Sequence, residues 1–292
     1  MRGALVGITV ALMLVLGVTA GQAGTRSAPH VTLIGDSVAD GIAQDNSAVA
    51  IVRQGVDMDI EVAPCRRVDQ PSCFVNGVQP PNVVQLANSM GAKLGPNVVV
   101  AVGYNDFEDQ YAGNIETALL AFKDAGVKHV WWLTLRAAHH GYVNMNADIV
   151  AAAQNHPEMS IIDWNVYSRS HPEWFQADGL HLLGDGSDAM AGLIHRRLLT
   201  DGIAVPAVGI ATSMLPAARH GRAYAITFRP TKGLAPYAWS LLERAPKGLH
   251  LLASGKLEGE PLVRAGRYVV NVRVTDSLGS TATRRFTLRV AA

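Results

Sequence analysis

Short apolar runs alternate with longer mixed segments along the first two thirds of the chain, and this pattern constrains the fold more than any other feature. The runs lie at 31–34, 58–62, 98–102, 130–135 and 160–164. Several are apolar throughout, which is typical of strands covered on both faces. The segments between them and after the last run predict helices at 38–54, 82–93, 114–125, 144–154 and 187–199. This repetition predicts a three-layer α/β domain with a mainly parallel sheet.

The periodicity changes near residues 204–206. Farther on, Tyr268, Val270, Val272 and Val274 alternate with residues that point the other way, and after a turn at 276–279 the alternation resumes through 286–290. A period of two is typical of half-buried antiparallel strands, and the remaining length suits a β-sandwich. We therefore expect two domains, an α/β domain at 30–203 and an all-β domain at 206–292.

The N-terminus has the features of a secretory signal. Arg2 precedes an almost wholly apolar stretch at 4–20, and small residues around Ala20 and Ala23 suit cleavage. We expect a signal peptide at 1–23 and a protein that is secreted or associated with the cell envelope. The alternative is an uncleaved membrane anchor, because the stretch is just long enough to span a bilayer.

The two cysteines of the chain, Cys65 and Cys73, lie close together in sequence. In an oxidising compartment this spacing favours a short disulfide loop. The alternatives are two free thiols or half of a metal site, but a zinc site needs further ligands, and the segment offers no other cysteine and no histidine.

Composition excludes some classes of function. Hydrophobic residues make up 49% of the chain and charged residues 17%, which supplies a core and argues against disorder. The formal net charge is +1, and there is no run of lysine or arginine. We therefore expect no nucleic-acid partner.

Ser37 directly follows the first predicted strand, in the sequence Gly35-Asp36-Ser37. Open α/β sheets bind ligands at the carboxyl ends of their strands. A serine placed there, before a helix, has backbone N–H groups beside it that can bind a developing oxyanion. The alternative is that Ser37 only caps the helix. We interpret Asp36 as a structural hydrogen-bonding partner of this loop.

Asp178 and His181 lie on one loop before the last predicted helix. A carboxylate three residues before a histidine can orient the ring through one nitrogen and leave the other free to accept a proton from a serine. The alternative is a surface loop with an incidental histidine, since the chain has ten.

Asn105 lies in the sequence Gly103-Tyr-Asn105-Asp106, directly after the run at 98–102. Its side-chain amide can donate a hydrogen bond to an oxyanion, although glycine, asparagine and aspartate also form ordinary turns. The three segments all follow predicted strands and meet at one edge of one sheet. Their coincidence indicates a serine-hydrolase site.

The ordered set Gly-Asp-Ser, Gly-x-Asn-Asp and Asp-x-x-His resembles the SGNH hydrolases, also called GDSL esterases, over residues 30 to about 201. The resemblance implies a flavodoxin-like α/β fold and a serine esterase without metal or cofactor. By position, Ser37 would be the nucleophile, His181 the general base and Asp178 the orienting carboxylate.

The resemblance also implies an oxyanion hole made by the Ser37 backbone N–H, the Asn105 side chain and a glycine N–H after the second strand. For this glycine we predict Gly77 in preference to Gly55. The segment from Cys65 to Gly77 departs from the usual family pattern.

The residues around the motifs, Asp163-Trp164 and Asp178-Gly-Leu-His-Leu182, are most similar to those in the extracellular SGNH domains of bacterial cell-envelope acyltransferases. This resemblance implies acetylated polysaccharide or peptidoglycan as the substrate, and relatives of this kind can transfer acyl groups as well as hydrolyse esters. Our leading hypothesis is hydrolysis of an ester on an acylated glycan. The alternatives are an O-acyltransferase that uses the same residues and a non-catalytic cell-wall binding or adhesion protein.

The tail resembles bacterial immunoglobulin-like domains, through Tyr224, Trp239, Tyr268 and Asp276 with their neighbours. The resemblance implies that Trp239 packs in the sandwich core and that Asp276 lies in a strand-end turn. It leaves two roles open, a contact with cell wall or polysaccharide and a spacer without a ligand; we favour the spacer slightly.

Overall fold

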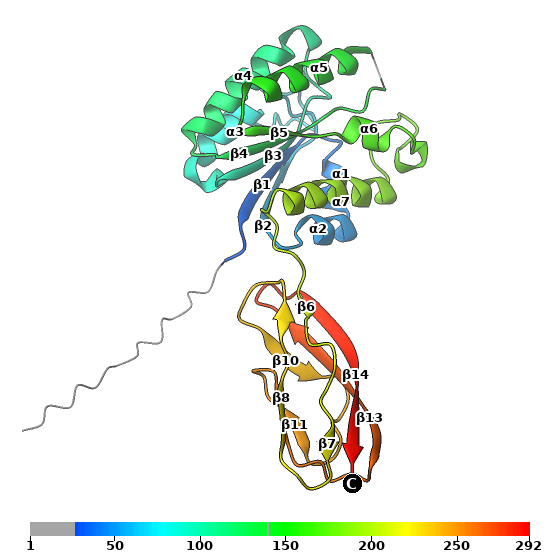
Figure 1. The fold of residues 1–292 in the computed structure, drawn as a ribbon. Coiled ribbons are helices and arrows are strands. Elements are labelled where there is room, and N and C mark those ends of the chain that lie inside the picture. The colour runs from blue at the N-terminus through cyan, green and yellow to red at the C-terminus, as the bar shows by residue number, and fades with distance from the viewer. Residues whose placement is uncertain (1–26, 139) are drawn as a thin grey trace, which may run out of the picture.

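The computed structural model describes residues 27–138 and 140–292, which fold into an α/β domain followed by an all-β domain (Figure 1). The predicted signal peptide at 1–23 lies outside the described residues. None of the helices within these two ranges is long and apolar enough to cross a membrane.

The α/β domain contains one sheet of five strands. These are β1 (His30–Gly35), β2 (Asp57–Val62), β3 (Asn97–Ala101), β4 (His129–Leu133) and β5 (Met159–Ile162). Their order is β2-β1-β3-β4-β5, and every neighbouring pair is parallel. This is the flavodoxin-like order, so the predicted fold class is confirmed. The order reverses between β1 and β3, where such sheets place their ligands.

Helices cover both faces of the sheet. One face packs against α1 (Asp40–Gln44), α2 (Asn46–Val52) and α7 (Gly184–Thr200), and the other against α3 (Val83–Met90), α4 (Glu108–Asp124) and α5 (His140–Asn155). Val98, Val100 and Trp132 belong to the second core, whereas Val99 and Trp131 belong to the first. Each strand is therefore apolar at consecutive positions because both of its faces are buried.

Several elements differ from the prediction. Helices α5 and α7 begin four and three residues earlier than expected. The helix expected at 38–54 is broken at Asp45, whose side chain accepts the N–H groups of Ser47 and Ala48 and so starts α2. Helix α4 begins at Glu108, six residues earlier than expected, with two acids in its first turn. The expected strand at 160–164 ends at Ile162, because Asp163 caps a further short helix. The elements that the sequence pattern did not predict separately are α6 (Trp164–Ser168) and the 3₁₀ helices η1 (Gly91–Leu94) and η2 (Pro172–Trp174).

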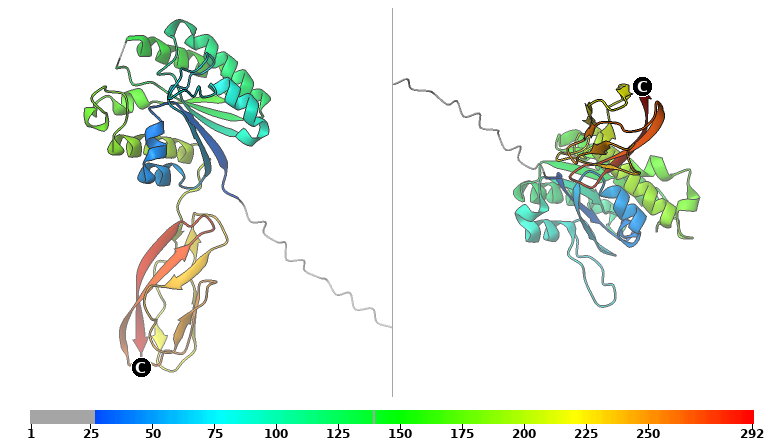
Figure 2. Two further views of the ribbon diagram at one scale, coloured as in Figure 1. Left: turned by 180° about the vertical axis from the view of Figure 1, so that it is seen from behind. Right: turned by 90° about the horizontal axis from the view of Figure 1, so that it is seen from below.

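The long loop between β2 and α3 contains the disulfide Cys65–Cys73, which confirms the predicted pairing. Beyond the disulfide, the backbone of Val75 pairs with that of Val78 in a tight turn. Seen from below, part of this loop projects past the helices of the domain (Figure 2).

The second domain is built from short strands and one long hairpin. The strands are β6 (Gly209–Ile210), β7 (Ala218–Arg219), β8 (Tyr224–Thr227), β9 (Pro230–Thr231), β10 (Ala238–Leu241), β11 (Leu249–Leu251), β12 (Lys256–Gly259), β13 (Gly266–Thr275) and β14 (Thr281–Ala291). They form sheets of order β10-β13-β14-β7, β11-β12-β8 and β6-β9. Trp239 is buried against Phe228, and Asp276 lies in the β13–β14 turn, where its side chain accepts the N–H groups of Leu278 and Ser280. The predicted immunoglobulin-like sandwich is confirmed.

The chain between the domains is held against the α2–β2 turn. The N–H of Val205 donates to the carbonyl of Gly55 at 2.8 Å. A Cβ on Gly55 would lie 2.1 Å from the Val205 carbonyl oxygen, and the φ of Gly55 is +72°. Only glycine fits this turn, so Gly55 serves the junction between the domains.

Substitution of Leu33 is a test of how tightly the α/β core is packed. It is 0% exposed in the core beneath α1, α2 and α7. We expect Leu33→Ala to lower the free energy of unfolding by about 3 kcal/mol, through lost burial and the cavity left behind. Leu120→Ala, at a position 59% exposed on α4, should change it by less than about 0.5 kcal/mol.

Urea unfolding followed by tryptophan fluorescence measures both variants, since four of the five tryptophans lie in the α/β domain. A cost for Leu33→Ala as small as that for Leu120→Ala would contradict a tightly packed core.

Candidate active site

Gly35 is the residue at which the chain leaves β1, and the close packing there admits no side chain. A Cβ on Gly35 would lie 2.5 Å from the Cβ of Ala39 and 2.9 Å from Cγ1 of Val62. The segment that follows Ser37 therefore folds tightly over the end of the strand. This places Ser37 at the carboxyl edge of the sheet, beside the reversal in strand order.

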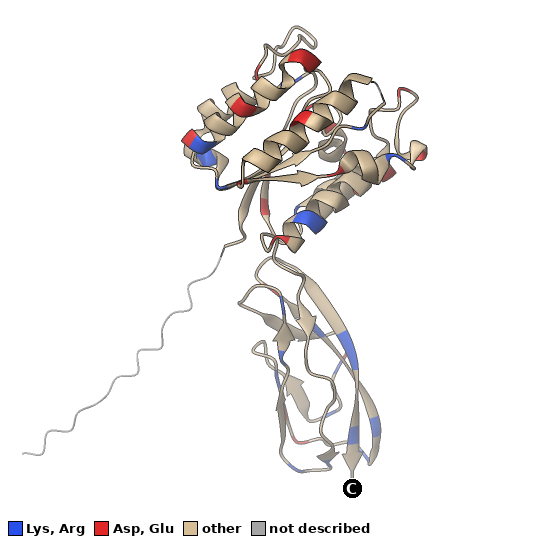
Figure 3. Cartoon of the chain, turned by 45° about the horizontal axis from the view of Figure 1, so that its top comes forward, with Lys and Arg blue, Asp and Glu red and all other residues tan. Residues whose placement is uncertain are grey.

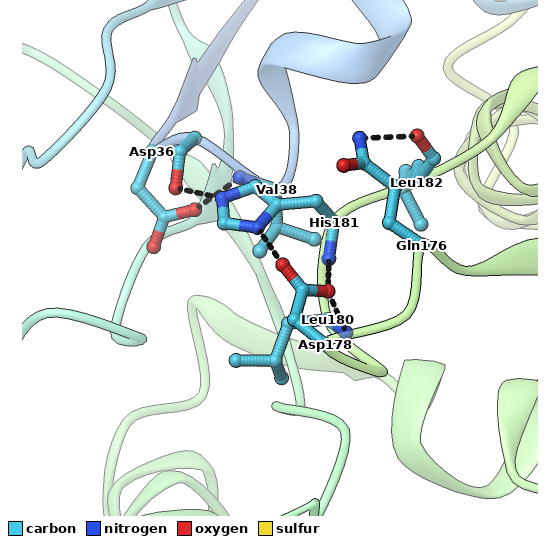
Figure 4. A network of polar contacts seen from close by, with 8 residues as sticks. Asp36, Val38, Gln176, Asp178, Leu180, His181 and Leu182 are labelled. Carbon is cyan, nitrogen blue, oxygen red and sulfur yellow. Dashed lines mark hydrogen bonds and ion pairs between the residues drawn. The ribbon is translucent and has the colours of Figure 1, made fainter.

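Ser37, His181 and Asp178 form a chain of hydrogen bonds. His181 Nε2 lies 3.0 Å from Ser37 Oγ, and His181 Nδ1 lies 2.6 Å from Asp178 Oδ2. Figure 4 shows the ring of His181 between the Asp178 carboxylate and the loop that contains Asp36 and Val38. The fold thus brings together two segments that are far apart in sequence. The catalytic roles of the three residues stay a prediction.

The loop that carries Asp178 and His181 is a narrow hairpin. Phe175 pairs with Leu182 in an isolated antiparallel bridge, and the Gln176 N–H donates to the His181 carbonyl at 2.8 Å. At the tip, Asp178 Oδ1 accepts the N–H groups of Leu180 and His181 (Figure 4). The hairpin fixes the histidine ring relative to the carboxylate before any substrate is bound.

The Asp178 carboxylate is held in its charged form. Its hydrogen bond from His181 and the N–H of Leu180 lower its pKa to about 2. An ionised Asp178 accepts the proton on Nδ1 of His181, which leaves Nε2 as the acceptor that faces Ser37. The side chains of His181 and Asp178 are 41% and 45% exposed, so the site is open to solvent.

Asp36 joins the Ser37 loop to the loop after β3. Its carboxylate is 0% exposed and accepts the N–H of Val38 through Oδ1 and those of Gly103 and Tyr104 through Oδ2. Burial raises the pKa of Asp36 to about 6, although these N–H donors oppose the shift. Asp36 is enclosed below the site, which agrees with the structural role expected of it.

Asn105 lies against the first residues of the loop after β2. Its side-chain amide donates to the Arg66 carbonyl at 3.4 Å, and its own carbonyl accepts Nε of Arg67 at 2.7 Å. The N–H of Ala63 in turn donates to the Gly35 carbonyl at 3.1 Å. The loops that follow β1, β2 and β3 therefore meet beside Ser37.

Each candidate glycine lies in a turn of its own. Gly77 lies in the exposed turn between Val75 and Val78, and a Cβ on it would meet no atom within 4 Å. Gly55 packs against the link between the domains, as described above. The contacts among the described residues connect neither glycine to Ser37.

The backbone conformation of Cys65 is one that glycine usually adopts, and it suits the role predicted for a glycine, that of an N–H donor to the oxyanion hole. It follows β2 almost directly, next to Pro64, which has no N–H to offer, and its φ is +67°. Among the described residues, the N–H groups of Cys65 and Ser37 donate no hydrogen bond to the protein. A positive φ is uncommon outside glycine, and a search of the sequence for glycine therefore passes over Cys65.

Asp106 ties the loop after β3 to the disulfide loop. Its carboxylate accepts the N–H of Val68 at 3.0 Å and the amide of Asn114 at 3.3 Å. Burial raises the pKa of Asp106 to about 7. The Asn105 backbone is consequently held on both sides, by Asp36 through Tyr104 and by Asp106.

The described residues contain no group of three or more His, Cys, Asp and Glu side chains that could hold a metal ion.

The chain is similar to known proteins in both of its domains. Residues 206–291 match the family model described as "Putative Ig domain". A stretch of 111 residues is 32% identical to O-acetyltransferase OatA of Staphylococcus aureus, a match that covers 37% of this chain and 17% of that protein. The chain spans less than a fifth of the length of the curated relatives it matches.

Solved structures that resemble part of this chain include an O-acetyltransferase and a carbohydrate esterase. One is the C-terminal catalytic domain of Streptococcus pneumoniae peptidoglycan O-acetyltransferase A with a methylsulfonyl adduct, at 23% identity and a TM-score of 0.46, covering 61% of this chain and 96% of that one. Another is a family 3 carbohydrate esterase of Clostridium thermocellum, at 12% identity and a TM-score of 0.46, covering 59% and 96%. The family match agrees with the immunoglobulin-like domain predicted from the sequence of the tail.

The raised pKa of Asp106 predicts that the free energy of unfolding depends on pH. Its pKa is raised from 3.8 to about 7, so the folded protein binds this proton more tightly than the unfolded chain does. The stability linked to Asp106 is therefore fully present below about pH 4 and is lost as the pH rises through about 7. We expect Asp106→Asn, which keeps an acceptor for the Val68 N–H, to reduce this loss.

Urea unfolding of both proteins across this range measures the effect. An equal fall in the free energy of unfolding for wild type and Asp106→Asn would contradict the assignment to Asp106.

Proposed function

We propose that the chain is an extracytoplasmic serine esterase that removes acyl groups, above all acetyl, from a glycan of the cell envelope. The observation that carries this proposal is the hydrogen-bonded chain from Ser37 through His181 to Asp178 at the switch point of the sheet. We assign the chemistry to a domain at 30–203, followed by a separate module at 206–292.

The reaction proceeds in two steps through an acyl-enzyme. His181 Nε2 accepts the proton of Ser37 while Oγ attacks the ester carbonyl carbon, and the carbonyl oxygen becomes an oxyanion. The oxyanion then collapses, the bond to the alcohol breaks, and the alcohol leaves with the proton from His181. Water, deprotonated by the same nitrogen, releases the acid in the second step. Asp178 keeps the imidazolium oriented and stabilised throughout.

We propose that three donors form the oxyanion hole: the Ser37 N–H, the Asn105 side-chain amide and the Cys65 N–H in place of Gly77. Donors that are in position before the reaction stabilise the developing charge without reorganisation. Three observations support Cys65. It lies just after β2, and its N–H donates no hydrogen bond to the described residues. The Asn105 amide contacts the carbonyl of the adjacent Arg66.

Two observations favour a polymeric substrate. The His181 and Asp178 side chains are nearly half exposed, so the site admits a bulky ester from solvent. The relatives include a protein whose name states a peptidoglycan O-acetyltransferase activity. A glycan of the cell envelope also agrees with the signal peptide expected at 1–23.

An O-acyltransferase is the second candidate, and the same relatives favour it. It would form the same acyl-enzyme and differ only in the second step, where a sugar hydroxyl replaces water. A non-catalytic cell-wall binding protein is the third candidate, and the complete hydrogen-bonded chain at Ser37 argues against it.

The nucleophile is tested with p-nitrophenyl acetate and the mature protein. We expect Ser37→Ala to lower kcat/KM by at least about 1000-fold, since removal of a triad serine abolishes acyl-enzyme formation. The control Ser89→Ala, on the exposed side of α3, should retain wild-type activity. Equal rates for wild type and Ser37→Ala would refute the assignment and favour the binding protein.

The same assay separates hydrolysis from transfer when chitotetraose is added as an acceptor. Free acetate as the main product supports the esterase, whereas acetylated chitotetraose as the main product supports the transferase.

The role of Cys65 is tested with two double variants that both lack the disulfide. Glycine adopts a positive φ without the cost of about 1 kcal/mol that other residues incur. We expect Cys65→Gly/Cys73→Ser to keep most of the wild-type kcat, and Cys65→Ser/Cys73→Ser to lose about tenfold or more as its N–H leaves the site. Equal kcat values for the two variants would contradict a role for this N–H.

A further inference from the structure

The two domains carry opposite net charges, which cancel in the total of +1. Residues 206–292 contain thirteen lysines and arginines against four acidic residues, a net charge of +9. Residues 1–205, which include the expected signal peptide, contain twelve against twenty, a net charge of −8, and the α/β domain at 30–203 alone contains ten against twenty, a net charge of −10. The second domain is therefore strongly cationic although the chain as a whole is nearly neutral.

Four of these arginines lie on one face of the β13–β14 hairpin. In its register Arg267 is opposite Arg289, Asn271 is opposite Arg285, and Arg273 is opposite Thr283. Most of the alternate positions, such as Val270, Val272, Phe286 and Leu288, are buried in the sandwich, so the four arginines occupy the outward positions, and each is exposed. Figure 3 shows Lys and Arg positions along these two strands. We call this surface the arginine face, made by Arg267, Arg273, Arg285 and Arg289.

The protein does not neutralise the arginine face. Within the described residues, none of its four guanidinium groups forms an ion pair or a hydrogen bond. Arg267 and Arg289 are directly opposed on neighbouring strands, an arrangement that destabilises a sheet. The acidic residue Glu243 accepts a hydrogen bond from the side chain of Asn271 and pairs with none of the four arginines.

Protection of a sheet edge does not explain these charges. Exposed edge strands often carry charged residues that prevent pairing with other chains. Here β13 and β14 are the two central strands of the order β10-β13-β14-β7. Their backbones are already paired on both sides over part of their length, so the arginines serve the face and not an edge.

The chemistry of the face fits an extended polyanion. Arginine binds carboxylate and phosphate groups in a bidentate manner. From Arg267 to Arg273 the strand advances by about 20 Å, at about 3.3 Å for each residue, which is longer than a single sugar. The outward positions between the arginines hold Thr283, Thr287, Asn271 and Val269.

We propose that the arginine face binds an anionic polysaccharide and thereby attaches the chain to it. The outward positions of β13 and β14 hold no aromatic residue on which nucleic-acid bases could stack. Val269 is their one large apolar residue, too little to insert into a membrane. This proposal is independent of the chemistry at Ser37.

The test measures binding of the full mature chain to polygalacturonate, with uncharged dextran as the control polymer. The face variant is Arg267→Thr/Arg273→Thr/Arg285→Thr/Arg289→Thr, since threonine suits strands. The matched control removes four charges from exposed loop positions of the same domain, as Arg222→Thr/Arg244→Thr/Lys247→Thr/Arg264→Thr. Thermal unfolding establishes that each variant is folded.

We expect the wild type to bind polygalacturonate and not dextran, with affinity that falls as salt rises. The face variant should bind at least about tenfold more weakly, and the loop variant within about threefold of wild type. Hydrolysis of p-nitrophenyl acetate should be the same in all three proteins, which separates this result from the proposed function.

Several outcomes would overturn the proposal. Equal loss in the face and loop variants would assign binding to total charge, and no binding of polygalacturonate beyond that of dextran would exclude the ligand. Tighter binding to single-stranded DNA or to phosphatidylglycerol vesicles would assign the face to another class of partner. Wild-type dimers in sedimentation that dissociate in the face variant would assign it to the acidic domain of a second copy.

Discussion

The arrangement of the candidate site depends on one buried carboxylate. Asp36 has no contact with solvent, and it remains acceptable in the core because three backbone N–H groups donate to it. Those donors come from the Ser37 loop and from the loop after β3, so one side chain sets the distance between the proposed nucleophile and Asn105. The cost of its desolvation is visible in its pKa, which burial raises to about 6.

Hydrogen-bonded local structure surrounds a candidate site that is open to solvent. The hairpin of Asp178 and His181 is internally bonded, and Asp106 and the disulfide restrain the loop after β2. Yet His181 and Asp178 remain nearly half exposed. Groups fixed in advance and open to solvent suit an ester that is presented by a large polymer, because the enzyme need not enclose it. The cationic second domain follows a linker whose Val205 is bonded to Gly55, and it adds a surface that suits an extended anionic chain.

Parts of the fold could be predicted because they depend on local pattern. The five strands, the change of period near residues 204–206 and the buried Trp239 all follow from where apolar residues recur. Other parts could not be predicted. Helix 38–54 breaks because the Asp45 side chain caps a second helix, a choice that apolar periodicity does not report. The oxyanion role predicted for Gly77 rested on residue type, whereas the loop places that glycine in an exposed turn.

The sequence by itself determined the classes of the two domains, the disulfide and the ordered motifs, because each is written in residue types and short spacings. Only the tertiary structure decided which backbone groups meet. It gave Cys65 a positive φ next to Arg66, whose carbonyl accepts the Asn105 amide, and gathered four arginines on one face of a hairpin. The physical reason is that backbone N–H groups carry no sequence signal, and that charges separated along the chain become one surface only when strand register aligns them.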